Sequence, residues 1–146
     1  MQNIMVTILV LMLAFPEMAA CQHENNRKSD LVFRSNKHNY GKLDYLEKAN
    51  HEFVFKNISD KPLAITNVKT KCDCADIKWL REPIKAGGKG TITIDYNTAI
   101  PGSFEKSVYV YTGEESPPAK LIIKGMVKKP DPGDSHYEHY KKKYKN

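Results

Sequence analysis

The chain has 146 residues, 40% of them hydrophobic, and a formal net charge of +6 at pH 7. This length allows one domain of ordinary size. Lysines supply most of the positive charge and are dispersed along the predicted strands, a pattern typical of solubility and not of nucleic-acid recognition. We therefore expect no nucleic-acid partner.

Residues 1–20 predict an export signal. The apolar run from Ile4 to Phe15 is shorter than the roughly 20 residues of a membrane-spanning helix and matches the apolar region of a signal peptide. It leads into Met18-Ala-Ala-Cys21, which resembles a bacterial lipoprotein signal peptide. The resemblance implies that Cys21 becomes the N-terminus and carries lipid. Two features depart from it: no Lys or Arg precedes the run, and Met stands where Leu is usual. An ordinary secreted protein cleaved nearby is the alternative.

Residues 21–29 are polar and predict a flexible tether. Gln22 in place of Asp favours the outer membrane over retention in the inner one. A lipidated cysteine carries more than one acyl chain, so anchoring is expected to be stable. The expected location is therefore the bacterial cell envelope, with the membrane as partner through Cys21 and the face left open. The mature charge would be about +7, and Cys72 and Cys74 would be too few for a multi-bridge disulfide framework.

Residues 30–127 predict one domain built from short strands separated by turns. Side chains alternate most clearly in 91–96, where Ile92, Ile94 and Tyr96 would face inward. About seven strands at spacings near 10 residues, with almost no helical periodicity, indicate an all-β, antiparallel β-sandwich. The expected strands are residues 30–34, 51–56, 63–70 with a break between Ile65 and Val68, 76–80, 91–96, 104–112 and 121–127.

Residues 128–146 predict a disordered basic tail, because they combine two prolines, a glycine and many charges with no aliphatic side chain. His136 and His139 are too few ligands to hold a metal without others. Tyrosines interleaved with lysines leave two alternatives open, a solvated chain end and a surface that contacts an anionic polymer.

Residues 31–127 contain a series of short motifs in a fixed order. The motifs are Tyr40-Gly41, Phe53-Val-Phe-Lys-Asn57, Pro62-Leu-Ala-Ile65, Cys72-Asp-Cys-Ala75, Trp79, Pro83-Ile-Lys-Ala-Gly87, Gly102-Ser-Phe104 and Ile123-Lys-Gly-Met-Val127. This series resembles the bacterial family called domain of unknown function fifteen-seventy-three, an immunoglobulin-like domain common in exported proteins and distantly related to domains of the Hydin and major-sperm-protein type. The resemblance implies an immunoglobulin-like sandwich and no established activity. The chain departs from the family's Cys-Gly-Cys-Thr motif at Asp73 and Ala75.

Cys72 and Cys74 are the candidates for chemistry. Two extended residues separate Cα atoms by about 6.6 Å, near the upper limit for a disulfide, so a bridge requires a turn or strain. A strained bridge is easily reduced, and two adjacent thiolates would suit Cu(I) or Zn(II). The negative charge of Asp73 disfavours thiolate formation. Three interpretations of the pair remain open. It is a structural pair packed near Trp79, a thiol or metal site, or a site with a cysteine nucleophile, for which the sequence places no histidine.

No other segment predicts a catalytic or cofactor site. Trp79 is either a ligand platform or a packing residue. The Gly87–Gly90 segment lacks phosphate-loop spacing. We therefore expect no enzyme and no cofactor other than possible copper or zinc. The expected function is a non-catalytic binding or assembly module whose sheet edges or loops contact an envelope protein or polymer; the alternative is a thiol-redox or copper/zinc protein using Cys72 and Cys74.

Overall fold

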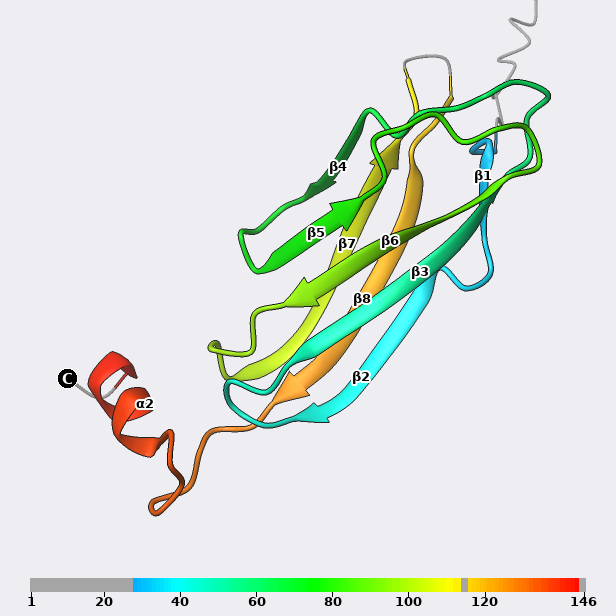
Figure 1. Ribbon diagram of the computed structural model, residues 1–146. Coiled ribbons are helices and arrows are strands. Elements are labelled where there is room, and N and C mark those ends of the chain that lie inside the picture. The colour runs from blue at the N-terminus through cyan, green and yellow to red at the C-terminus, as the bar shows by residue number, and fades with distance from the viewer. Residues whose placement is uncertain (1–27, 114–115, 145–146) are drawn as a thin grey trace, which may run out of the picture.

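The computed structural model describes residues 28–113 and 116–144. Within this part of the chain, eight strands form two four-stranded sheets, ordered β1-β3-β6-β5 and β2-β8-β7-β4, that face each other across one core (Figure 1). The fold is therefore the predicted all-β, immunoglobulin-like sandwich. The strands are β1 (Leu31–Phe33), β2 (Lys37–Leu43), β3 (Ala49–Asn57), β4 (Asn67–Thr70), β5 (Ala75–Trp79), β6 (Lys89–Tyr96), β7 (Gly102–Tyr111) and β8 (Ala119–Val127).

Strand β2 was not predicted, and it is the exception to an otherwise antiparallel arrangement. It pairs in parallel with β8, and its register shifts between Asn39 and Lys42. Gly41 lies in that shift with a φ of +71°, a conformation that favours glycine. A polar strand interrupted by a glycine shows no period-two hydrophobic pattern, which explains why the sequence did not predict it.

Alternation of apolar side chains builds the core, as predicted. Ile92 and Ile94 on β6 are fully buried, and Tyr96 is 7% exposed. Each large apolar side chain buried in this way contributes about 1.5–3 kcal/mol to folding. The other most deeply buried large apolar side chains are Phe53, Phe55, Val108, Val110, Leu121, Ile123 and Val127.

Each sheet accommodates a phenylalanine by placing a glycine on the adjacent strand. Phe55 on β3 lies opposite Gly90, where a Cβ atom would meet the Phe55 ring at 2.5 Å. Phe104 on β7 lies opposite Gly125, where a Cβ would meet its ring at 2.9 Å. A glycine at these positions allows the ring to pack over the neighbouring backbone.

Asn57 is fully buried at the end of β3 and connects two loops to the sandwich. Its amide nitrogen donates to the carbonyl oxygens of Lys61 at 2.9 Å and Ile84 at 3.0 Å. Its side-chain oxygen accepts from the Ser59 N–H at 2.9 Å. Leaving such a buried amide without these partners would cost folding free energy. Asparagine suits this position, after the two aromatic residues of β3, because its side chain both donates and accepts.

The predicted disordered tail is wrong for residues 137–144, which form the helix α2 (Tyr137–Tyr144). Tyr140 is 7% exposed because its ring packs edge-on against Tyr45, with ring centroids 5.7 Å apart. The Tyr144 hydroxyl donates to the Ala99 carbonyl at 2.7 Å. Tyrosine rings thus provide the apolar contact that holds the helix against the sandwich. The prediction of disorder had considered only the absence of aliphatic residues.

Helix α2 lies at one end of the sandwich, and the described chain begins near the other end (Figure 1). In residues 28–113 and 116–144, no helix has the length and apolar character needed to cross a membrane.

Candidate functional site

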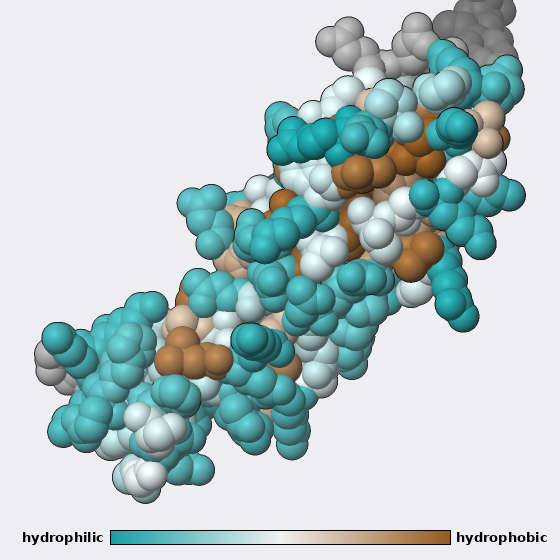
Figure 2. Space-filling view, viewed as in Figure 1, coloured by the Kyte–Doolittle hydropathy of each residue, from teal (hydrophilic) through white to brown (hydrophobic). Residues whose placement is uncertain are grey.

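The β4–β5 side of the sandwich contains the predicted cysteine pair. β4 is an edge of one sheet and β5 an edge of the other, and the turn of residues 71–74 joins them. A groove of about 370 Å³ lies between them. Hydrophilic residues cover most of the face shown in Figure 2, with small apolar areas between them. The groove is lined by Val68, Lys69, Thr70, Cys72, Asp73, Ala75, Ile77 and Trp79.

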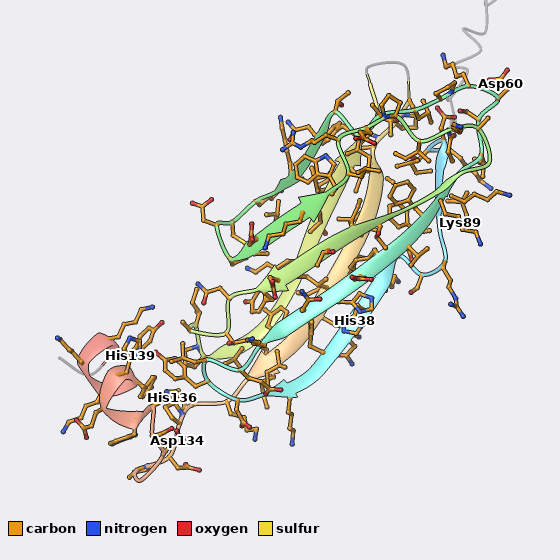
Figure 3. All side chains as sticks on the ribbon, viewed as in Figure 1. His38, Asp60, Lys89, Asp134, His136 and His139 are labelled. Atoms are coloured by element: carbon orange, nitrogen blue, oxygen red, sulfur yellow. A yellow bond between two sulfur atoms is a disulfide. The ribbon has the colours of Figure 1, made fainter. Side chains whose placement is uncertain are left out.

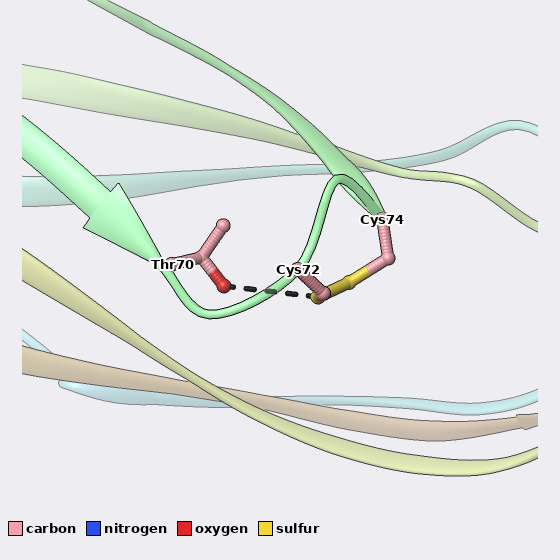
Figure 4. The surroundings of a disulfide bond; sticks show 3 residues. All are labelled: Thr70, Cys72 and Cys74. Carbon is pink, nitrogen blue, oxygen red and sulfur yellow. Dashed lines mark hydrogen bonds between the residues drawn. A yellow bond between two sulfur atoms is a disulfide. The ribbon is translucent and has the colours of Figure 1, made fainter.

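Cys72 and Cys74 are joined by a disulfide, with their Cα atoms 5.2 Å apart (Figure 4). This separation is shorter than in extended chain because the residues lie in a turn. Cys74 is 6% exposed, and its carbonyl accepts from the Asn97 N–H at 2.9 Å. Cys72 is half-buried in the groove, with its sulfur 3.9 Å from the Thr70 hydroxyl. Cys72 is therefore the sulfur more accessible to a reagent, and the pair could bind metal only after reduction.

Trp79 is a packing residue that also lines the groove. Its indole N–H donates to the Ile65 carbonyl at 3.3 Å. The Arg81 guanidinium lies 4.2 Å from the ring centroid, a cation–π distance. Contacts on two sides fix the indole and leave one part of it facing the groove.

The opposite side of the sandwich is filled by a pair of histidines that the sequence did not predict. His38 on β2 and His51 on β3 stack with ring centroids 3.5 Å apart and an 8° angle between planes. Tyr40 and Phe53 pack edge-on against them at 4.4 and 4.7 Å respectively. The Tyr40 hydroxyl donates to the Ile94 carbonyl at 3.1 Å. These rings join an edge of one sheet to the other sheet; Figure 3 labels His38.

Burial lowers the pKa of both stacked histidines. For His38, desolvation is the cause. For His51, desolvation is the largest cause, followed by the charge of His38, while Glu52 opposes them. Burial raises the pKa of Tyr40 to about 12, with a further contribution from Asp95, so Tyr40 keeps its proton as a donor. One sequence signal for this cluster existed, because His51 shares the inward parity of Phe53 on β3.

The remaining predicted positions do not assemble into a site. His136 and His139 lie on or beside α2 (Figure 3), and the His139 ring bonds to the Tyr45 hydroxyl at 2.9 Å. Gly88 lies in a turn, where its N–H donates to Lys85. Among the described residues, no three His, Cys, Asp or Glu side chains gather as metal ligands would. Cys21 lies outside the described residues.

The part of the chain that forms the sandwich matches a family model. Residues 31–127 match the model described as "Protein of unknown function (DUF1573)". The chain belongs to this family. The match covers both sheets of the sandwich and the cysteine turn. No curated protein matches the chain.

Solved structures similar to the chain support the fold. A protein of unknown function from Porphyromonas gingivalis W83 has a TM-score of 0.59 at 18% identity, covering 68% of this chain and 47% of that one. A family 123 glycoside hydrolase from Clostridium perfringens has 0.54 at 13%, covering 67% and 24%. The Vibrio cholerae VesB protease has 0.52 at 16%, covering 66% and 32%. The DUF1573 chain spans less than half of each, and identities this low show the fold alone.

The histidine pair predicts acid sensitivity. Because the folded pKa of each histidine is lowered, the unfolded chain binds protons first as pH falls below about 6.5. Stability conferred by the neutral pair is therefore present above that pH and lost as pH falls through the folded pKa. Thermal denaturation from pH 7.5 to 5.5 should show a falling melting temperature. A His38→Phe, His51→Phe double variant should show a flatter profile, whereas His136→Phe should follow the parent; equal slopes for all three would contradict this assignment.

Proposed function

We propose that this DUF1573 protein is exported, anchored by lipid on Cys21 at the outer membrane, and acts as a non-catalytic binding or assembly module through the edges of its sheets. The observation that carries the binding role is the open sandwich. Its outer strands β1, β5, β2 and β4 each pair on one side only within the described residues. An unpaired edge offers backbone N–H and C=O groups to a partner strand.

The anchoring part of the proposal rests on the N-terminal sequence. The apolar run from Ile4 to Phe15 is followed, three residues later, by two alanines and Cys21. The polar residues between Cys21 and β1 would separate the sandwich from the bilayer. Its edges would then face other components of the envelope, an exported protein or a polymer.

Lipid attachment is tested directly at Cys21. In the parent bacterium, the full chain should incorporate radiolabelled palmitate and sediment with membranes. A Cys21→Ser variant should lose the label and move to the soluble fraction, whereas the neighbouring Gln22→Ser variant should behave as the parent. Palmitate incorporation that survives Cys21→Ser would contradict the assignment.

Edge binding is tested by photo-cross-linking in intact cells. A photoreactive residue is placed singly at Val32, Lys42, Lys69 or Lys78, which lie on the four edge strands, and as a control at Lys124 on the central strand β8. At least one edge position should yield a discrete adduct that the Lys124 control does not. Adducts from the control alone, or from no edge position, would overturn the edge-binding role.

A second candidate function is thiol-redox or copper/zinc chemistry at Cys72 and Cys74. The observation that favours it is the disulfide in the β4–β5 groove, in which Cys72 is half-buried and lines the groove while Cys74 is buried. An incoming thiolate that attacked Cys72 would form a mixed disulfide and release the Cys74 thiolate. Reduction would instead present two sulfur ligands, for which Cu(I) is the best-matched ion.

The cysteine chemistry is tested by thiol counting and Cu(I) titration of the purified full chain carrying Cys21→Ser, in which Cys72 and Cys74 are the remaining cysteines. Two thiols should appear only after reduction, and the reduced chain should then bind about one Cu(I), as expected for a two-thiolate site. The Cys72→Ser, Cys74→Ser double variant should bind none yet keep the edge adducts. A reduced parent that binds no copper and exchanges with no added disulfide would end this candidate.

A further inference from the structure

The free edge of β5 exposes backbone groups from alternate residues. The Asn97 N–H donates to the Cys74 carbonyl, which makes Cys74 and Asn97 a hydrogen-bonded pair. By antiparallel alternation, Asp76 and Lys78 also bond to β6. The backbone N–H and C=O groups left to point away from β6 belong to Ala75, Ile77 and Trp79.

The β3–β6 ladder gives the same alternation independently. The Asn57 N–H donates to the Gly88 carbonyl at 2.9 Å, so even-numbered residues of β6 bond to β3. The odd-numbered residues Thr93 and Asp95 therefore bond to β5. They lie opposite Lys78 and Asp76 in the register, as required.

The sequence of β5, Ala-Asp-Ile-Lys-Trp, is complementary to itself when reversed. We propose that the β5 edge binds the β5 edge of a second copy of this chain, antiparallel and two-fold symmetric, with Ile77 opposite Ile77. Asp76 of each copy then lies opposite Lys78 of the other. Trp79 lies opposite Ala75, which pairs the largest side chain with the smallest.

Charge selects one register among those that the free backbone groups allow. With Ile77 at the centre, the hydrogen-bonded pairs are Ile77 with Ile77 and Ala75 with Trp79, the three residues whose groups are free. Registers centred on Asp76 or Lys78 would also pair odd-numbered residues through their free backbone groups, but each would place like charges opposite each other. Opposite charges that face each other across strands stabilise a sheet, and like charges destabilise it.

The charged side chains of β5 are exposed and can pair with those of a second copy. Lys78 and Asp76 of one copy lie 3.3 Å apart, with side chains 70% and 67% exposed, and a surface pair of this kind contributes little to folding. Pairing would replace the contact within each copy, two in all, by two contacts between the copies. The two chains would form one continuous eight-stranded sheet.

The β4–β5 groove adds apolar surface to the same contact. Val68, Ile77 and Trp79 face the core but are only half-buried, because the sandwich is open on this side. Edge-to-edge pairing brings the groove of one copy against that of the other and covers these side chains. This inference rests on the proposed edge-binding function and names its partner as a second copy.

The test is a charge exchange between two differently tagged full chains, co-expressed, cross-linked on the membrane and co-purified. Parent chains should co-purify. Lys78→Asp paired with itself, and Asp76→Lys paired with itself, should each lose about tenfold or more of this signal, since both facing pairs become like-charged. Lys78→Asp mixed with Asp76→Lys should recover it. The control, Lys42→Asp on the β2 edge, should match the parent.

Recovery of the signal in the mixture would show that both variant chains are folded. Loss of the signal in each variant alone could then not be attributed to misfolding. Absence of parent co-purification, charge variants that still self-associate, or a mixture that fails to recover would each overturn the β5 pairing. Edge adducts at other positions in the cross-linking experiment would then still support the binding module. Failure of both experiments would remove the proposed function as well.

Discussion

A sandwich of two separate sheets cannot satisfy the backbone of its outermost strands by itself. Each sheet of this DUF1573 chain has two such strands, and the open sides between the sheets also leave gaps in the core. Because the sheets do not close into a barrel, the unpaired edges and the open sides between the sheets remain. The features of this domain that bear on function lie at these open sides: the histidine stack on one side and the cysteine turn with its groove on the other.

The two open sides of the sandwich are filled to different extents. On the β2–β3 side, His38, His51 and Tyr40 fill the gap with rings, and the Tyr40 hydroxyl reaches across to β6. On the β4–β5 side, a short turn constrained by the Cys72–Cys74 disulfide connects the sheets, and the inward side chains remain half-buried. The first arrangement closes the sandwich from within. The second leaves surface that a partner can cover.

Local pattern was sufficient for the strands that alternate. The inward positions of β6 and the break before Val68 followed from period two and from turn-forming residues. β2 and α2 did not follow from pattern, because β2 is polar and pairs in parallel with the distant β8, and α2 is held by tyrosines that pack on Tyr45. The histidine stack could not be predicted for the same reason, because it depends on β2 of one sheet facing β3 of the other. Long-range pairing, and not composition, determines these features.

The two proposals together constrain how the protein would sit on a membrane. A two-fold axis through Ile77 makes the long axes of the two sandwiches antiparallel, so their N-terminal ends lie at opposite ends of the pair (Figure 1). The nine residues from Cys21 to Ser29 span at most about 30 Å when fully extended. Both lipids would therefore reach one bilayer most readily if the pair lay along its surface. In that orientation α2 of each copy, with Lys141, Lys142 and Lys143 in its last turn, would lie at the same end of the pair as the other copy's tether.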